Sequence, residues 1–250
     1  MSERLCVIGG AKFLPPSSPV ATEIRNQLKL PNPAYKQAMA LRGRGKWVNV
    51  PDAHIDGCQE IPAEHPWRGG LSVPRCVDLS RYGLEMRDMR GAPDASSLSL
   101  QSNIKLRDYQ ESAVDSWLKA GGEGVIVAPC GAGKTVMGLA ATTKIDTKVL
   151  VLVHTRDLAA QWGERCQQIV GVDATLYGGG KKDDTGRIVV ATFQTLERMR
   201  WAERYQWAKQ FGMCIVDEAH HVPAATFCSV MVTIPARYRL GLTATPDRPD

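Results

Sequence analysis

Short apolar runs alternate with amphipathic stretches along the second half of the chain. The runs are apolar nearly throughout and cover Gly124 to Ala128, Lys148 to Val153, Arg187 to Ala191, Met213 to Val216 and Tyr238 to Leu242. Runs of this kind predict strands that are buried on both faces, and the stretches between them predict the covering helices. The pattern therefore predicts an α/β domain with a parallel sheet, in which ligands bind beyond the carboxyl ends of the strands.

The first hundred residues lack this alternation. They hold ten of the fifteen prolines, and short apolar pieces such as Trp47 to Val50 and Leu71 to Leu79 are separated by proline and glycine. Such spacing predicts a smaller mixed domain of short strands. Residues 91–103 are small and polar enough to form a linker. We therefore expect an accessory domain over residues 1–100, including this linker, and a larger domain over residues 104–250.

The composition is that of an ordinary globular protein without a membrane segment. Of the 250 residues, 44% are hydrophobic and 23% are charged, and every apolar run is far shorter than the roughly 20 residues of a membrane span. Because no secretory signal is evident, the expected compartment is cytoplasmic. The net charge of +5 suits a partner that carries phosphates, although a surplus of this size fits many other proteins.

The seven cysteines are spread along the chain without any close pair. This spacing predicts reduced thiols rather than a disulfide framework or a zinc ribbon. A metal site at His54, Cys58, His65 and Cys76 is the less favoured alternative, because these spacings match no common ligand pattern.

A glycine-rich loop follows the first predicted strand of the larger domain. Residues 128–135 read Ala-Pro-Cys-Gly-Ala-Gly-Lys-Thr and precede a helical run, with Ala128 where the general pattern has glycine. Small residues let backbone N–H groups turn towards phosphates, Lys134 supplies a charge to the terminal phosphates and Thr135 offers a hydroxyl to Mg²⁺. The expected nucleotide-binding residues of the loop are Cys130, Gly131, Ala132, Gly133, Lys134 and Thr135.

Two acidic residues follow the predicted strand that ends at Val216. Asp217 is expected to hold Mg²⁺ through the water shell of the ion, at the site to which Thr135 offers its hydroxyl. Glu218 is expected to polarise the attacking water and accept its proton. A nucleotide kinase needs no such glutamate, so the pair favours hydrolysis. The alternative is a structural role, in which the acids stabilise the start of a helix.

Asp217-Glu218-Ala219-His220 resembles the DEAH-type motif of the superfamily 2 helicases. Four further stretches resemble motifs of that family in the family's order: Leu106 to Gln110 the glutamine motif, His154 to Leu158 with Gln161 and Trp162 motif Ia, Ala191 to Leu196 a motif that touches the nucleic-acid backbone, and Gly241 to Pro246 motif III. The resemblance covers about residues 104–250. It implies the first RecA-like lobe of an ATP-dependent motor on nucleic acid.

The resemblance also implies roles for residues outside the two central motifs. Gln110 reads the adenine edge, with Arg107 beside it in the nucleotide site, so the nucleotide is ATP. His220 contacts the region of Thr243 and Thr245 and couples the state of the phosphates to the nucleic-acid contacts. The expected catalytic residues are Lys134, Asp217, Glu218 and His220.

A motor of this kind holds nucleic acid by contacts that ignore its sequence, which are made by hydroxyls, amides and cations. Such groups stand at Thr155, Arg156, Thr192, Gln194 and Thr195. The stretch from Tyr177 to Lys182 adds a basic loop, where Gly178 and Gly179 allow a backbone to approach closely. A solvated hairpin turn is the alternative for this stretch.

Two stretches combine basic and aromatic residues and are further candidates for a nucleic-acid contact. Leu41 to Trp47 favours DNA binding by charge and stacking. In Arg198 to Trp207 the helical spacing of the aromatic residues fits a core role equally well.

Within the superfamily, the opening at Leu106 and the ending at Arg248 most resemble the XPB, phage UvsW and type III restriction-subunit group. This favours DNA, duplex or branched, over RNA as partner. The sequence ends at Asp250 after motif III, so we expect a second RecA-like lobe in cis or in trans and a weakly active isolated chain. The alternatives are an ATP-gated nucleic-acid clamp that does not translocate, and the ATPase subunit of a restriction system.

Overall fold

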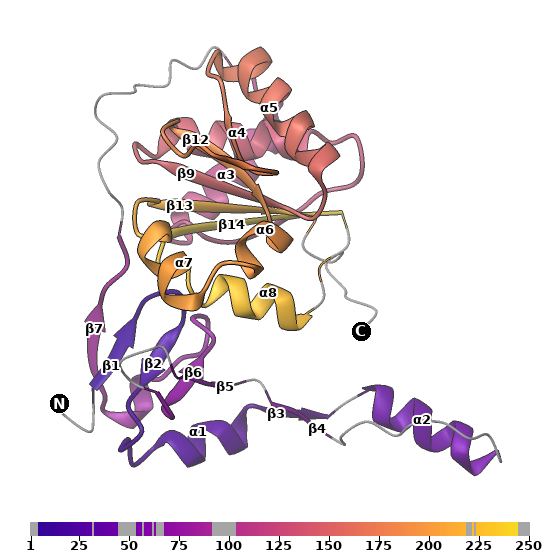
Figure 1. The fold of residues 1–250 in the computed structure, drawn as a ribbon. Coiled ribbons are helices and arrows are strands. Elements are labelled where there is room, and N and C mark those ends of the chain that lie inside the picture. The colour runs from indigo at the N-terminus through magenta and orange to yellow at the C-terminus, as the bar shows by residue number, and fades with distance from the viewer. Residues whose placement is uncertain are drawn as a thin grey trace. The chain divides into compact units, whose positions relative to one another are not determined.

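The computed structural model divides the chain into two compact units, Met1–Asp88 and Met89–Asp247 (Figure 1). It describes residues 5–31, 33–44, 54–56, 58–61, 63, 68–91, 104–218, 222 and 224–244. The linker predicted over residues 91–103 therefore lies outside the described residues, apart from Gly91.

A small mixed sheet organises the first unit. Its strands follow the order β5-β6-β2-β1-β7, in which β1 and β7 are parallel and the other neighbours are antiparallel. The strands are β1 (Leu5–Ile8), β2 (Lys12–Leu14), β5 (Gln59–Glu60), β6 (Leu71–Val73) and β7 (Glu85–Asp88). Buried residues of the sheet, such as Leu14 and Val73, pack with Ile24 of α1 (Ala21–Gln27). The prediction of a mixed domain of short strands is confirmed.

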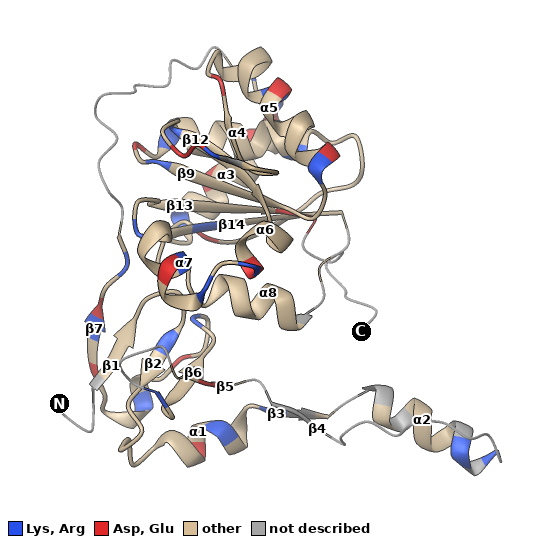
Figure 2. Cartoon of the chain, in the orientation of Figure 1, with Lys and Arg blue, Asp and Glu red and all other residues tan. Residues whose placement is uncertain are grey.

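The rest of the first unit is a two-stranded antiparallel sheet, a helix and a 3₁₀ turn. β3 (Lys29–Pro31) pairs with β4 (His54–Asp56), α2 spans Pro33–Gly43, and η1 spans Ser80–Tyr82. Lys and Arg colour the end of α2 in Figure 2, and Arg42 in its last turn and Arg44 after it are exposed. The remainder of this basic stretch, from residue 45 on, lies outside the described part of the chain, so DNA binding there stays a prediction.

The second unit is built on a sheet with the order β11-β10-β12-β9-β13-β14-β8. Every neighbouring pair is parallel except the edge pair β10 and β11. Its strands are β8 (Glu123–Val127), β9 (Val149–Val153), β10 (Thr175–Gly178), β11 (Lys181–Lys182), β12 (Ile188–Thr192), β13 (Met213–Asp217) and β14 (Tyr238–Thr243). Each of the five predicted strands is confirmed, with bounds that differ by no more than one residue.

Helices cover both faces of this sheet (Figure 1). On one face lie α3 (Asp108–Lys119), α4 (Lys134–Lys144) and α5 (Arg156–Val170), and on the other lie α6 (Phe193–Glu197), α7 (Trp201–Ala208) and α8 (Ala224–Met231). Successive side chains of β9 point to opposite faces of the sheet, so Val149 and Val151 pack in the core of the first face and Leu150 and Leu152 in the core of the second. β9 and β12 contain no charged residue, and β13 contains one only at its end, Asp217. None of the described helices is long and apolar enough to cross a membrane.

The prediction that all five strands are buried on both faces is wrong for β8. Val125 is 62% exposed and Val127 is 51% exposed. The reason is topological, because β8 is the edge strand and the second core takes its strand residues from β9, β12 and β13 in the described chain. An apolar run therefore indicated the strand correctly but not its place in the sheet.

Arg204 ties the three helices of the second layer together. It is 4% exposed, and its guanidinium donates hydrogen bonds of 2.8 Å to Thr233 Oγ1, the Leu196 carbonyl and the Ser229 carbonyl. These acceptors belong to α6, to α8 and to the turn that follows α8. A buried cation is tolerated here because its donors are satisfied.

We expect Arg204→Ala to lower the free energy of unfolding of the chain by roughly 2–4 kcal/mol, since it removes three charge-assisted bonds and leaves a cavity. Arg200→Ala, at an exposed arginine just before α7, is the matched control and should change stability by less than about 0.5 kcal/mol. Denaturant unfolding measures both variants. Equal stability of the two would contradict the role of Arg204.

Candidate functional site

The carboxyl ends of the parallel strands bring the predicted functional residues to one edge of the second unit. In the strand order from β10 to β8, the residues at or just after these ends are Gly178, Thr192, Thr155, Asp217, Thr243 and Ala128. The first three are nucleic-acid candidates, and the last three belong to the expected nucleotide site and its coupling motif. The edge is therefore divided into two adjoining halves.

The glycine-rich loop leaves β8 and turns directly into α4. The Ala128 N–H donates to the Thr243 carbonyl at 3.0 Å, which holds the start of the loop against β14. Gly131 and Gly133 have φ values of +83° and +79°, a conformation that residues with a side chain rarely adopt. Lys134 begins α4 directly after Gly133, so its side chain leaves the helix start beside the loop.

Gln110 fastens the start of α3 to this loop. Its Nε2 donates to the Ala132 carbonyl at 2.9 Å, and its Oε1 accepts from the Arg107 N–H at 3.0 Å. The Tyr109 hydroxyl donates to the same Ala132 carbonyl at 3.0 Å. A Cβ on Gly133 would lie 2.6 Å from Gln110 Nε2, so the glycine also makes room for this side chain. The sequence analysis missed this capping role of Gln110, although its place three residues after Arg107 is the spacing of a capping box.

Asp217 ends β13 and is only 6% exposed. Burial raises the pKa of its carboxyl above the ordinary value, while the hydrogen bond from Trp162 acts in the opposite direction. In that bond, Trp162 Nε1 donates to Asp217 Oδ2 at 2.7 Å. The charges of Glu218 and Lys134 are smaller contributions that raise and lower this pKa respectively.

Glu218 lies between the glycine-rich loop and the end of β14. Its Oε1 is 3.1 Å from Lys134 Nζ, and its Oε2 accepts from the Ala244 N–H at 3.4 Å. Among the described residues other than glycine, Glu218 has the only positive φ, +51°. Such a backbone costs on the order of 1–3 kcal/mol and is common at functional sites. His220 and Thr245 lie outside the described residues, so their coupling to Thr243 stays a prediction.

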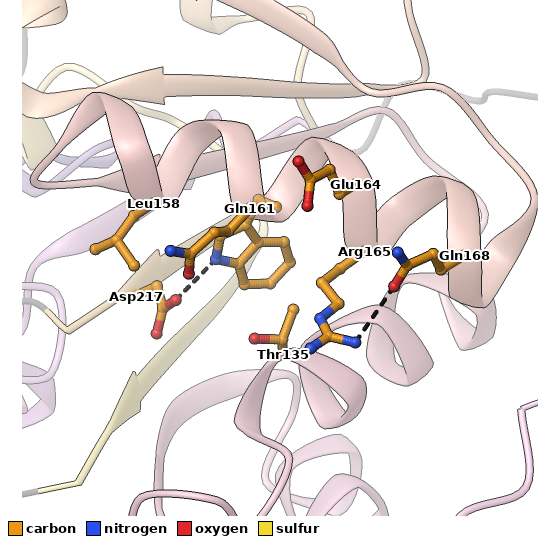
Figure 3. A pocket seen from close by; sticks show the side chains of 8 residues that line it. Thr135, Leu158, Gln161, Glu164, Arg165, Gln168 and Asp217 are labelled. Atoms are coloured by element: carbon orange, nitrogen blue, oxygen red, sulfur yellow. Dashed lines mark hydrogen bonds between the residues drawn. The ribbon is translucent and has the colours of Figure 1, made fainter.

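A cavity of about 330 Å³ opens between the start of α4 and α5 (Figure 3). Thr135 and Asp217, the two expected Mg²⁺ ligands, both line it. A hydroxyl and a carboxylate are the hard oxygen donors that Mg²⁺ prefers, and Mg²⁺ takes its remaining ligands from phosphates and water. The donor set therefore fits that ion. The remaining lining residues are Leu158, Gln161, Trp162, Glu164, Arg165 and Gln168.

Two threonines of the nucleic-acid half cap helices. Thr155 Oγ1 accepts from the Leu158 N–H at 3.2 Å at the start of α5, and Thr192 Oγ1 accepts from the Thr195 N–H at 3.2 Å at the start of α6. The sequence analysis assigned these hydroxyls only to nucleic acid, although threonine before an amphipathic run is a common N-cap. Arg156 and Gln194 directly follow the caps and are exposed.

Gly178 brings the stretch from Tyr177 to Lys182 against the start of α6. The stretch is a hairpin between β10 and β11, in agreement with the hairpin alternative. A Cβ on Gly178 would lie 2.7 Å from Thr195 Oγ1, and its φ of +133° belongs to a region that only glycine adopts readily. The fold therefore brings Gly178 and Thr195, two nucleic-acid candidates from separate motifs, into contact.

Part of the basic and aromatic stretch from Arg198 to Trp207 serves packing. Besides the buried Arg204, Trp207 lies 4.6 Å from Tyr177 between ring centroids and donates to Asp184 Oδ2 at 2.7 Å. Trp201 and Tyr205 stack on each other, with centroids 5.4 Å apart, and are half-buried. Of the three aromatic residues in the core alternative, Trp201, Tyr205 and Trp207, the structure packs Trp207 against the second core.

The parallel sheet, with the glycine-rich loop and the acidic pair at its carboxyl edge, defines a RecA-like α/β domain. The family model described as "Type III restriction enzyme, res subunit" matches residues 103–248, more than half of the chain. The chain belongs to this family.

Curated relatives and a solved structure agree with this assignment. The chain is 37% identical over 151 residues to "DNA 3'-5' translocase XPB2" of Sulfurisphaera tokodaii, and the aligned region covers 60% of the chain and 33% of the relative. It is 35% identical over 182 residues to "DNA 3'-5' helicase XPB" of Mycobacterium tuberculosis, which covers 69% and 33%. The chain thus spans about a third of the length of these relatives. The crystal structure of the UvsW helicase from bacteriophage T4 has the same fold, with a TM-score of 0.59 at 18% identity over 90% of this chain and 86% of that one.

We expect Gly178→Ala to lower the free energy of unfolding by roughly 2–4 kcal/mol, because the new methyl group meets Thr195 in a glycine-only conformation. Gly179→Ala is the matched control, since Gly179 also has a positive φ but nothing lies within 4 Å of its Cβ position. Its cost should be about 1 kcal/mol. If the two variants unfold at the same denaturant concentration, the close approach of Gly178 to Thr195 is refuted.

Proposed function

We propose that this chain is the ATP-binding lobe of a DNA-dependent ATPase that translocates on duplex or branched DNA or opens it. The observation that carries this proposal is the division of the sheet edge into two halves. Nucleotide groups follow β13, β14 and β8, while nucleic-acid candidates follow the neighbouring β10, β12 and β9. One rigid sheet therefore joins the site of hydrolysis to the site of DNA contact.

In this proposal ATP lies along the glycine-rich loop, with its adenine towards Gln110 and Arg107. Lys134 neutralises the terminal phosphates, and Thr135 and Asp217 hold Mg²⁺. Bound Mg²⁺ would supply charge neutralisation at the phosphates. Glu218 orients the attacking water and accepts its proton.

The ion pair between Lys134 and Glu218 supports a simple order of events. Lys134 Nζ lies 3.1 Å from Glu218 Oε1 and 3.3 Å from the Ala128 carbonyl. A terminal phosphate competes for the same ammonium group because it carries more negative charge than the carboxylate. Glu218 then loses its cation partner and is free to accept a hydrogen bond from water.

β14 provides the route from this site to the remainder of the edge. The Ala244 N–H donates to Glu218, the Glu218 N–H donates to the Leu242 carbonyl at 2.9 Å, and the Thr243 carbonyl accepts from Ala128. A change of partner at Glu218 therefore acts directly on the segment that contains Thr243. We propose that His220 and Thr245 extend this coupling.

The relatives favour DNA as the partner, and the second half of the edge suits a nucleic-acid backbone in general. The relatives named above are described as DNA helicases and translocases. The second half of the edge also offers contacts that ignore base sequence, through the exposed Arg156 and Gln194, the capping threonines and the glycine hairpin.

The proposal includes a second RecA-like lobe, in cis or in trans, which supplies arginines worth on the order of 10³–10⁵ in rate in phosphoryl-transfer sites. The chain alone is then weakly active.

ATP turnover tests the proposal, measured for this chain and for the full-length protein without nucleic acid and with single-stranded DNA, duplex DNA, forked DNA and duplex RNA. Stimulation by DNA in the full-length protein is the expected result. If no polymer stimulates turnover while ATP still binds, the protein is an ATP-gated clamp and the motor function is wrong.

Glu218→Gln should leave ATP binding within a few-fold of the unchanged protein and slow hydrolysis at least about 100-fold, because the amide cannot accept the proton of the attacking water. The matched control is Glu203→Gln, which makes the same charge change at an exposed glutamate of α7. Single-turnover hydrolysis in the full-length protein measures both. Normal hydrolysis by Glu218→Gln would remove that residue from the chemistry.

Cys130 allows nucleotide binding to be followed without turnover, because it is an exposed thiol in the glycine-rich loop. ATP with Mg²⁺ should slow its alkylation roughly tenfold at about ten times the dissociation constant, by simple competition. The exposed Cys76 and Cys228 are internal controls and should react at an unchanged rate. Mass spectrometry of the peptides reports all three; equal labelling of Cys130 with and without nucleotide would argue against binding at the loop.

A further inference from the structure

Trp162 connects the helix of motif Ia to the expected Mg²⁺ ligand. It lies on α5, is 2% exposed, and its indole N–H donates to Asp217 Oδ2 at 2.7 Å (Figure 3). The acceptor is buried as well, so little water competes for this bond. The sequence resemblance placed Trp162 with motif Ia and indicated nothing about the carboxylate.

A glycine in α4 makes room for the indole. A Cβ on Gly138 would lie 3.0 Å from Trp162 Cη2 and 3.0 Å from Leu242 Cδ1. Glycine in a helix interior is less favourable than alanine, and here its absent side chain admits the large ring. α4, which begins at Lys134, α5 and the end of β13 therefore converge at Trp162.

The hydrogen bond constrains one oxygen of a two-oxygen ligand. An indole nitrogen is a donor only, so Trp162 stabilises an accepting carboxylate oxygen. With Oδ2 held, rotation of the carboxylate is restricted and Oδ1 keeps one orientation, in a residue that lines the same cavity as Thr135. Partners that orient metal ligands in this way change metal affinity by roughly 10–100-fold when they are removed.

We propose that Trp162 is a positioning residue that orients Asp217 for Mg²⁺ and ties this ligand to α5, the helix that begins at Thr155 and Arg156. The inference rests on the proposed function of the edge as an ATP and Mg²⁺ site. It adds a link, separate from motif III, between Asp217 and the helix whose start carries the nucleic-acid candidates Thr155 and Arg156.

Trp162→Phe removes the donor and keeps an aromatic ring. Binding of a fluorescent ATP analogue is titrated with Mg²⁺ and repeated in EDTA. We expect the Mg²⁺ concentration at half-maximal binding to rise roughly tenfold, and binding in EDTA to stay within about twofold. A purely structural loss would weaken binding equally in both conditions.

Trp117→Phe is the matched control. Trp117 is 4% exposed, belongs to the same core and donates from Nε1 to the Arg239 carbonyl at 3.0 Å. Its replacement also removes a buried indole hydrogen bond, but one that does not involve Asp217. We expect a loss of thermal stability in this variant with an unchanged Mg²⁺ midpoint.

The indole N–H resonances of the unchanged protein give a readout that needs no variant to fold well. The Trp162 signal, assigned by its absence in Trp162→Phe, should shift when Mg²⁺ is added to the nucleotide complex, while the Trp117 signal should not. An unmoved Trp162 signal, or a Trp162→Phe variant with the Mg²⁺ midpoint of the unchanged protein, would overturn the positioning role. Absence of any Mg²⁺-dependent nucleotide binding in the unchanged protein would instead overturn the proposed function.

Discussion

The candidate site depends on the register between β8, β14 and β13. In this register Val127 pairs with Thr243, and Leu242 pairs with Asp217, so the start of the glycine-rich loop and the acidic pair leave the sheet side by side. A slip of one residue would reverse the faces of every side chain in the moved strand and separate Lys134 from Glu218. Backbone hydrogen bonds between parallel strands thus set the geometry on which the proposed chemistry relies, before any side chain takes part.

The same groups serve the fold and the proposed function in several places. Thr155 and Thr192 cap helices, while the exposed residues beside them are the candidates for contacts with nucleic acid. Gln110 donates a hydrogen bond to the glycine-rich loop and is also expected to bind the adenine of ATP. Trp162 fills the core between α4 and α5 and also donates to Asp217. Such dual use follows from the position of the site at the ends of elements, where unpaired backbone groups and functional side chains occur together. It also means that a substitution here changes stability and binding together, which is why matched controls are needed.

Local sequence patterns predicted much of the architecture of the second unit. The five apolar runs predicted their strands to within one residue, because the inner strands of a parallel sheet are covered on both faces and are largely apolar. The glycine-rich loop and the Asp217-Glu218 pair were recognisable because phosphate and metal chemistry restrict residue types at a fixed spacing. The exposure of β8 was not predictable in this way, since an apolar run contains no information about which strand stands at the edge. Arg204 was equally unpredictable, because a charged residue is ordinarily expected on the surface. It is buried because its hydrogen-bond partners come from segments up to about thirty residues away in the chain.

By itself, the sequence determined the α/β class, the positions of the strands and the residue types of the two central motifs, because these depend on interactions between near neighbours in the chain. Only the tertiary structure decided the strand order, and with it the division of the edge between Gly178, Thr192 and Thr155 on one side and Asp217, Thr243 and Ala128 on the other. It also decided that Gly178 meets Thr195 and that Trp162 meets Asp217. These contacts join residues from 17 to 55 positions apart (195 − 178 and 217 − 162), and their existence depends on how whole layers pack rather than on any local pattern.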